Sequence, residues 1–397
     1  MATLPPNSHV YDATDQALFV GIPEGLVEPQ RALDILGGTI KIVEVLQDVE
    51  ASHFSKIPQY IAKFCLDHFE GQTKKVAYGV SVIGITDRHE PILKKSLNYS
   101  KKALQEAGIK SRYINKDFQN PQSAALLDEQ IIEKGLEMVI LKGNKAVSVG
   151  KTVALQNINA YSERDYRRPE RDARQGMLPP KLAQMMLNIS GVNHLNSEAL
   201  PERIIYDPFC GVGTVLTEAY RMGYSVLGSD IIGENIKKTD ANLQWTRNQI
   251  SIPHQTYRLF LQNASFIKKN DLAESISAIV SETYLGPPMS RMPNHQEVKD
   301  NFGKIEETLL LFFESIHNVI ASGTPIVVSL LAYRSQNRYI SMDNLVEKIF
   351  NVGFHAEDLI PAELTGKFKI LEKGQQSIIY ERPDQIVCRQ IWKFVKN

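Results

Sequence analysis

The sequence is poor in cysteine, in tryptophan and in long apolar runs. Its 397 residues include three cysteines and two tryptophans. An odd number of widely spaced cysteines forms neither a disulfide framework nor a metal-ligand spacing, so a reducing compartment and no bound metal are expected. No run approaches the roughly 18 to 20 apolar residues that span a bilayer, and the N-terminus lacks the pattern of a signal peptide. These absences predict a globular, cytoplasmic protein that does not associate with membranes.

An excess of charge is also missing, because 45 basic and 45 acidic residues cancel. Proteins that bind nucleic acids usually carry a basic excess, so the balance argues against such a partner unless the positive charge is concentrated. The segment 161–183 concentrates it, and its prolines and glycine exclude a long continuous helix. Its basic residues are Arg164, Arg167, Arg168, Arg171, Arg174 and Lys181. Two interpretations stay open: a solvated interdomain linker whose charges pair locally, or a segment that faces phosphate or a cofactor. On the second interpretation these six residues are expected to bind RNA.

A glycine-rich turn between a strand and a helix is the most informative pattern in the chain. The apolar residues 203–207 predict the strand, and the helix begins at Thr214. Gly211 and Gly213 lack a Cβ atom, so the backbone turns tightly and approaches a ligand closely. The helix that follows directs free N–H groups toward the same gap. This pattern predicts a βαβ unit that binds an adenosine-containing cofactor.

Two acids indicate which cofactor suits this turn. Asp230 ends the second strand of the unit, where an acid accepts hydrogen bonds from ribose hydroxyls. Asp207 and Pro208 precede the turn, and a carboxylate there would repel a phosphate. The turn also lacks the third glycine of a pyrophosphate-binding loop. S-adenosyl-L-methionine, which carries a cationic sulfonium and an amino group, is therefore the predicted cofactor.

The two halves of the chain show different patterns. From about residue 185 strands alternate with helices, which predicts a mostly parallel sheet with helices on both faces. Strands are expected at 203–207, 224–229, 256–262, 277–282, 324–332 and 376–381, and helices near 214–222, 233–250, 302–321 and 342–351. The last strand is expected to close the sheet as its antiparallel member. The first half predicts a compact α+β module, preceded by a smaller unit.

Three motifs, taken together, resemble those of one family. They are Arg164–Pro169, Gly176–Ala183 and Asp207–Thr214. In this combination they resemble the tRNA guanosine-10 N2-methyltransferases of archaea and eukaryotes. The resemblance covers nearly the whole chain and is strongest between residues 150 and 230. It implies a ferredoxin-like unit and a THUMP domain, which binds RNA, in front of a Rossmann-like class I methyltransferase domain.

The expected fold class is therefore α/β, with an α+β THUMP-like region before the Rossmann-like domain. The resemblance implies a ferredoxin-like unit at 1–60, a THUMP-like domain at 61–158, an Arg-rich linker at 159–184 and a methyltransferase domain at 185–397. It further implies that the cofactor is bound by Asp207, Pro208, Gly211, Gly213, Thr214, Asp230, Asn263 and Ala264. Relatives usually have Asp-Ala where this chain has Asn263-Ala264.

The catalytic motif departs from the family pattern. Amino-methyltransferases carry Asp/Asn-Pro-Pro-Tyr/Phe after the fourth strand, where an oxygen accepts a hydrogen bond from the target amine and the aromatic ring stacks on the base. This chain has Ser281-Glu282-Thr283-Tyr284. Tyr284 keeps the aromatic position, and either Ser281 or Glu282 takes the acceptor position. We favour an active site with Glu282 as acceptor over a decayed motif, because a Glu and a Tyr at the tip of a buried strand have no role in a core.

The leading hypothesis is an RNA methyltransferase that modifies the exocyclic N2 amine of a guanosine in tRNA. Two alternatives stay open: an RNA-binding protein with a vestigial methyltransferase domain, and a DNA amino-methyltransferase. The sequence also leaves open whether the chain is a monomer or has a small activating subunit, and whether it adds one or two methyl groups. Phosphate contacts in the THUMP-like region are expected from Lys74, Lys75, Lys110, Arg112, Lys142 and Lys145.

Overall fold

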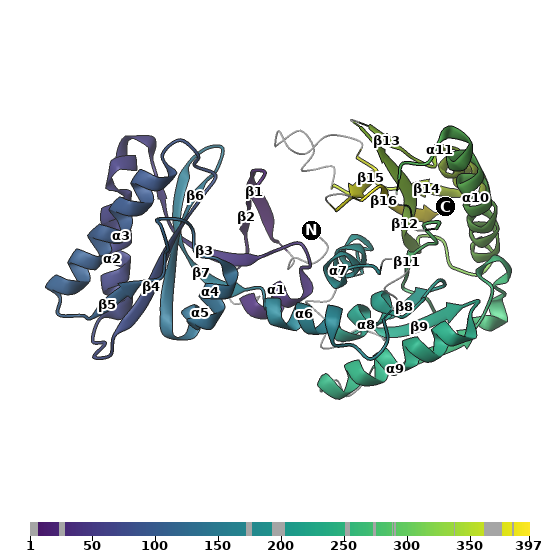
Figure 1. Ribbon diagram of the computed structural model, residues 1–397, viewed down its shortest axis with the longest axis horizontal. Coiled ribbons are helices and arrows are strands. Elements are labelled where there is room, and N and C mark those ends of the chain that lie inside the picture. Colours follow the sequence, from purple (N-terminus) through teal and green to yellow (C-terminus); the bar gives the residue numbers. More distant parts are fainter. Residues whose placement is uncertain are drawn as a thin grey trace.

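Two sheets organise the chain in the computed structural model (Figure 1). The structure describes residues 7–23, 28–171, 177–192, 203–250, 255–272, 275–287, 289, 291–336, 338–360, 375–382 and 385–397. A five-stranded sheet forms the core of the N-terminal half, and a nine-stranded sheet forms that of the C-terminal half. A short hairpin of β1 (His9–Ala13) and β2 (Leu18–Gly21) lies between them.

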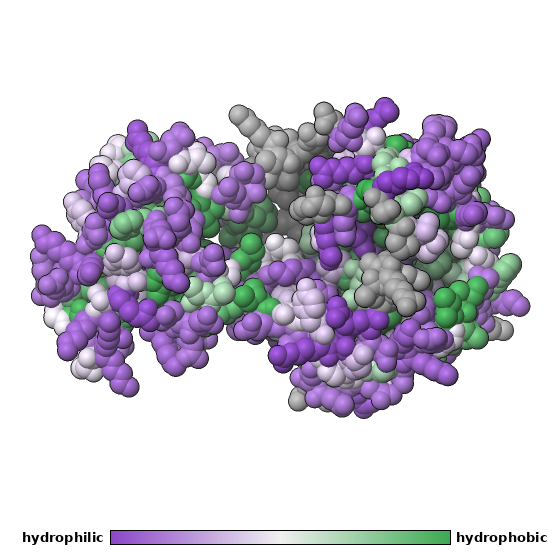
Figure 2. Space-filling view, in the orientation of Figure 1, coloured by the Kyte–Doolittle hydropathy of each residue, from purple (hydrophilic) through white to green (hydrophobic). Residues whose placement is uncertain are grey.

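The five-stranded sheet is mixed, and its two long helices lie against one face. In spatial order its strands are β3 (Lys41–Val49), β7 (Val147–Leu155), β6 (Gly135–Lys142), β4 (Val76–Ile83) and β5 (Ser111–Tyr113). Alternate apolar residues of β4, among them Tyr78 and Val80, pack in one buried cluster with the helices α2 (Ile57–Phe69) and α3 (His89–Glu106). The visible outer surface of this half is mainly hydrophilic (Figure 2).

The expected boundary at residue 60 falls inside α2, and the structure does not divide the chain there. Strand β3, from the expected first unit, pairs along its length with β7. The hydrogen bonds between β3 and β7 and the packing of α2 thus join residues on both sides of position 60. Residues 123–134 form two short helices, α4 (Ser123–Asp128) and α5 (Ile131–Lys134), separated at Gln130 by a left-handed backbone conformation.

The C-terminal sheet has the alternating, mostly parallel order that the sequence predicts. Its main path runs β10 (Tyr257–Leu261), β9 (Ser225–Asp230), β8 (Ile204–Asp207), β11 (Ala278–Glu282), β12 (Pro325–Ser335), β16 (Val387–Lys396) and β14 (Phe354–Ala356). The strands from β10 to β12 are parallel, and β16 is antiparallel to both of its neighbours on this path. The predicted Rossmann-like α/β fold is confirmed.

Helices cover both faces of this sheet. One buried cluster joins the sheet to α7 (Pro180–Ile189), α8 (Thr214–Arg221) and α9 (Gly233–Gln249). A second cluster joins the opposite face to α10 (His295–His317) and α11 (Asp343–Val352). Because α8 follows β8 directly, the glycine-rich turn lies at the carboxyl edge of the sheet.

Two expectations for this half are wrong. The antiparallel strand next to β12 is β16, and the expected segment forms β15 (Ser377–Tyr380), which pairs antiparallel with β16 off the main path. Strand β13 (Arg338–Ile340) likewise pairs with β12. Polar residues such as Arg389 interrupt the apolar pattern of β16 and hide it in the sequence. Helix α10 begins at His295 rather than near 302, because Asn294 and Glu297 form a capping box.

The two halves meet where α1 (Pro29–Ile35) docks on α7 (Figure 1). The side chains of Gln184 and Asn188 on α7 donate hydrogen bonds to the carbonyl oxygens of Asp34 and Ile35. Gly37 lies against the same helix, since a Cβ atom added to it would come within 2.2 Å of the Lys181 carbonyl oxygen. The absence of a side chain at this position therefore allows the close approach.

Gly37→Ala should destabilise the protein at this junction. A methyl group forced against the backbone of α7 should lower the free energy of unfolding by about 1–3 kcal/mol, measured by urea denaturation. Gly303→Ala in α10 is the matched control, because a Cβ atom there meets no atom within 4 Å. Equal stabilities of the two variants would contradict the proposed close packing.

Candidate active site

Four parallel strands end next to one another at the glycine-rich turn. Strands β8, β9 and β11 end at Asp207, Asp230 and Glu282, and β10 is followed by Asn263. Since β8 pairs with both β9 and β11, these ends meet at one edge of the sheet. Ligands of open α/β sheets bind at this carboxyl edge, so the predicted cofactor and catalytic residues come from neighbouring strand ends.

The turn itself is held from outside by hydrogen bonds. Gly211 and Gly213 have φ values of +52° and +82°, a region that favours glycine. Thr239 Oγ1 donates to the Gly211 carbonyl oxygen at 2.8 Å, and Asn242 Nδ2 donates to that of Val212 at 2.8 Å. A Cβ atom added to Gly211 meets no atom within 4 Å, whereas one on Gly213 would strike Thr239. The backbone at Gly211 is thus open to a ligand.

Asp230 supports the turn from the end of β9. Its carboxylate accepts hydrogen bonds from the backbone N–H groups of Gly211 and Ile232, each at 2.9 Å, and from Asn235 Nδ2 at 3.1 Å. Asp230 is buried, at 8% exposure. The acid that the sequence assigns to the ribose therefore also fixes the position of the turn.

Asp207 is the most enclosed acid of the site, at 2% exposure. Ser281 Oγ donates to Asp207 Oδ1 at 2.6 Å, and the Phe209 N–H donates to the same oxygen at 3.1 Å. Burial raises the pKa of Asp207 to about 7, and the nearby charges of Asp230 and Glu282 act in the same direction. A cation beside this carboxyl group would stabilise its ionised form.

Glu282 is paired with a residue from a distant part of the sequence. Arg389 Nε, on β16, donates to Glu282 Oε1 at 2.6 Å. Burial raises the pKa of Glu282, while Arg389 and a hydrogen bond from the Leu178 backbone oppose that rise. Ser281 is fully buried, and its hydroxyl donates a hydrogen bond to Asp207. Of the two candidates for the acceptor position, Glu282 is the one that retains exposure.

Tyr284 faces outward beside this pair and is 55% exposed. The preceding residue anchors it, because Thr283 is buried and its Oγ1 donates to the Ser329 carbonyl oxygen at 2.7 Å. A tyrosine that the chain holds out of the core at a strand end has a free ring face for a planar ligand. This placement fits the predicted stacking role.

The remaining predicted cofactor residues lie on the same edge. Asn263 caps the short helix Ala264–Phe266 by accepting from the Ser265 N–H at 2.9 Å, and Ala264, Pro208 and Thr214 are buried. Sequence reasoning missed a set of exposed apolar side chains that follow or end the strands here: Ile231, Ile232, Leu261 and Phe266. For Ile231 and Ile232 the signal in the sequence is an apolar pair directly after the strand-end acid Asp230.

Two arginines of the Arg-rich segment bind other residues of the protein. Helix α6 (Ile158–Tyr166) carries Arg164, which pairs with buried Glu218 of α8 at 2.6 Å. Arg168 is buried, and its Nη1 donates to Thr214 Oγ1 at 2.7 Å. The expectation that these two arginines contact RNA is therefore wrong, because their guanidinium groups bind α8.

The other basic residues of the segment have different environments. Lys181 Nζ donates to Gln156 Oε1 at 2.6 Å. Arg167 is exposed beside Glu163, and Arg171 lies over the ring of Tyr166. Arg174 lies outside the described residues. Arg167 and Arg171 thus remain candidates for a contact with RNA.

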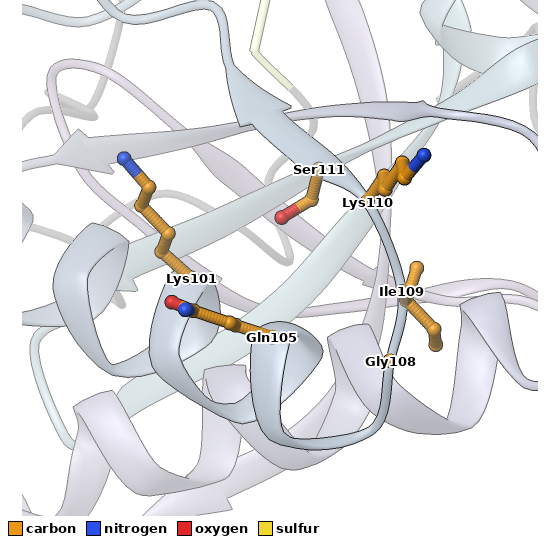
Figure 3. Close-up of a pocket in the computed structure, with 6 residues that line it drawn as sticks. All are labelled: Lys101, Gln105, Gly108, Ile109, Lys110 and Ser111. Atoms are coloured by element: carbon orange, nitrogen blue, oxygen red, sulfur yellow. The ribbon is translucent and has the colours of Figure 1, made fainter.

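A separate pocket lies in the N-terminal half, at the end of α3 (Figure 3). It is lined by Lys101, Gln105, Gly108, Ile109, Lys110 and Ser111. Lys110 is one of the predicted phosphate contacts, and the side chains of Lys101 and Lys110 extend on opposite sides of the pocket. The sequence did not single out Lys101.

Comparison with known proteins identifies the glycine-rich unit. Residues 164–256 match the family described as UPF0020: RMKL-like, methyltransferase domain. The chain carries a methyltransferase domain. This finding confirms the prediction made from the glycine-rich turn and the acids around it.

Curated relatives point to one enzyme family. The chain is 28% identical over 198 residues to the tRNA (guanine(10)-N2)-dimethyltransferase of Methanothermobacter thermautotrophicus, covering 50% of each protein. It is 27% identical over 204 residues to the enzyme of the same name from Methanocaldococcus jannaschii, covering 46% of this chain and 53% of the relative. The predicted resemblance to this family is confirmed, although the match spans about half the length of these relatives.

Among solved structures, TrmN from Thermus thermophilus is similar, with a TM-score of 0.49 and 14% identity, over 98% of this chain and 93% of that one. Within the part of the chain that the structure describes, no helix combines the length and apolar character needed to cross a bilayer. In the same residues, His, Cys, Asp and Glu form no group of three or more that suits a metal ion.

Asp207→Asn should remove a pH-dependent loss of stability. A pKa of about 7 in the folded protein means that the folded state keeps a proton that the unfolded chain releases near pH 4. This contribution is complete below pH 4 and is lost as the pH rises through 7. Between pH 5 and 8 the free energy of unfolding should therefore fall for the wild type by on the order of 2 kcal/mol more than for the variant.

Urea denaturation across this pH range measures the effect. Asp300→Asn, at an exposed position of α10, is the control and should follow the wild-type curve. Parallel curves for the wild type and Asp207→Asn would contradict the raised pKa.

Proposed function

We propose that this protein is a cytoplasmic, S-adenosyl-L-methionine-dependent methyltransferase that modifies the N2 amine of a guanosine in tRNA. The observation that carries the proposal is one sheet edge that combines an open glycine turn, the acids Asp207 and Asp230, and the Glu282–Tyr284 tip. The names of the curated relatives support the choice of tRNA and of the guanine N2 atom.

The residues at this edge fit S-adenosyl-L-methionine. Open space at Gly211 lets a ligand approach the backbone closely. Asp207 is a buried acid without a cationic partner among its named contacts, and a cationic group of the cofactor would ionise it. Asp230 has an oxygen at the turn for ribose hydroxyls, and exposed Ile231 and Phe266 offer apolar surface for a purine ring.

The chain's main contribution to the reaction is orientation. When bound, the cofactor supplies the methyl group: the N2 lone pair forms the new N–C bond, the S–C bond breaks, and its electron pair stays on sulfur. The Glu282 carboxylate would accept a hydrogen bond from the N2 amine, which directs the lone pair, and would take up the proton that N2 loses. Flipping the base out of a helix costs a few kcal/mol, and stacking on Tyr284 would offset about 1–3 kcal/mol of it.

The N-terminal half would hold the RNA by its shape and backbone. We retain the proposed assignment of a THUMP-like domain, with β3 and α2 included in it because they pack with its sheet. Lys101 and Lys110, which flank the pocket of Figure 3, are suited to a phosphate group. Exposed Arg167 and Arg171 lie on the path from this half to the glycine turn.

Cofactor binding tests the assignment of the site. Calorimetry should show that S-adenosyl-L-methionine binds about tenfold more tightly at pH 7.5 than at pH 6, because a protonated Asp207 cannot pair with a cation. Asp207→Asn should bind weakly at both values. No binding by the wild type, together with binding of tRNA, would instead select an RNA-binding protein with an inactive domain.

Activity tests the substrate. The wild type should produce N2-methylated guanosine in tRNA transcripts, detected by mass spectrometry of nucleosides. Tyr284→Ala should lower kcat/KM for tRNA by roughly 5- to 150-fold, the equivalent of 1–3 kcal/mol of stacking, whereas Tyr284→Phe should retain most of it. Tyr339→Ala, which removes an exposed ring on β13, is the control. Equal labelling of DNA and RNA would favour the DNA amino-methyltransferase.

A further inference from the structure

The pair of Glu282 and Arg389 bridges two strands that are not neighbours. Glu282 lies opposite Ser329 of β12, and Arg389 lies opposite Leu331 of the same strand, so β12 separates the two. Arg389 is 5% exposed, whereas the side chain of Glu282 is 22% exposed. The arginine therefore approaches from the buried side and leaves part of the glutamate accessible.

The carboxylate of Glu282 has acceptor capacity left. A carboxylate accepts about four hydrogen bonds. Arg389 Nε occupies one of these positions and the Leu178 backbone N–H occupies another. Tyr284, whose ring is exposed, follows two residues later in the chain. A planar ligand on that ring would present its edge to the carboxylate.

The positive charges around Glu282 oppose the rise in its pKa that burial causes. Arg389 reaches it from β16, Arg382 acts on it from the segment after β15, and Asp207 is the acid of the neighbouring strand end. Two cations and one acid that is half protonated near neutral pH favour an ionised Glu282. A buried ion pair adds little net stability compared with apolar packing, so stability gives no reason to place this pair at the strand tip.

We propose that Glu282, oriented by Arg389, selects guanine over adenine by accepting hydrogen bonds from both N1–H and N2–H of the target base. This rests on the proposed function. The guanine edge offers two adjacent donors to a carboxylate. The adenine edge offers one donor, N6–H, and an N1 lone pair that the carboxylate repels. Arg389 is a positioning residue, because it touches Glu282 and not the base.

Replacing the carboxylate by an amide tests the selection. The wild type first identifies its target guanosine in a tRNA transcript, and a second transcript carries adenosine at that position. Glu282→Gln should methylate the guanosine transcript about 10- to 100-fold more slowly than the wild type does. Its preference for guanosine over adenosine should narrow, because an amide offers one acceptor and one donor to adenine. Glu357→Gln, which removes the acid paired with Lys393 on β16 at 2.7 Å, is the matched control.

Replacing the arginine tests the positioning role. Removing the cation raises the pKa of Glu282, so the acidic limb of the pH profile of kcat for Arg389→Met should move to higher pH. Arg389→Lys should restore the profile in part, and Lys393→Met, on the same strand, should leave it unchanged. The affinity for S-adenosyl-L-methionine should stay at the wild-type value in all three variants.

Arg389→Met leaves the carboxylate of Glu282 unpaired, which could prevent folding, so a double variant provides a second test. Glu282→Gln/Arg389→Met removes both charges, so it should fold with a Tm near that of the wild type and show the selectivity of Glu282→Gln alone. Unchanged selectivity in a folded Glu282→Gln protein, or an unchanged pH profile in folded Arg389→Met, would overturn this inference and leave the proposed function intact. A wild type that methylates no guanosine would overturn the proposed function itself.

Discussion

Three acids lie at one edge of the sheet, and the rest of the site has to stabilise their charges. Asp207, Asp230 and Glu282 end neighbouring strands, and the charges of Asp230 and Glu282 add to the rise in the pKa of Asp207 that burial causes. The chain stabilises two of them with its own groups. Asp230 accepts from three donors of the turn and of α9, and Glu282 pairs with Arg389. An anionic edge of this kind disfavours phosphate and favours a cationic ligand.

Of the three acids, Asp207 is the one whose negative charge the chain's own groups stabilise least. Burial raises its pKa to about 7, and its named donors, a hydroxyl and one backbone N–H group, offset only part of this rise. Ionising it costs free energy until a cation arrives. A methyl donor with a positive charge would supply that cation, so the binding of the cofactor and the charge state of the site are linked. Ser281 is unavailable to the target amine because it is fully buried, where its hydroxyl donates to Asp207.

Local sequence patterns predicted the turn and the sheet, whereas pairs between distant residues escaped them. Gly211, Gly213 and Asp230 are close in the chain, and their spacing alone defines the βαβ unit. Arg389 lies 107 residues after Glu282, and the two meet only because β12 pairs with β11 on one side and β16 on the other. The strand that brings Arg389 there has a mixed apolar and charged pattern, so neither the strand nor the pair was predicted.

The Arg-rich segment shows how charge counting along a sequence misleads when the charges are buried. Arg164 and Arg168 were assigned to RNA because they cluster, yet each binds α8, and Asn242 further ties the backbone of Glu170 to that of Val212. A buried pair such as Arg164–Glu218 is stable only with both partners in place, because either charge alone would be strongly disfavoured. The segment that leaves the N-terminal half is therefore fixed to the helix that begins at the glycine-rich turn. Under the proposed function, this packing within the protein would help to determine which part of a bound RNA reaches Tyr284.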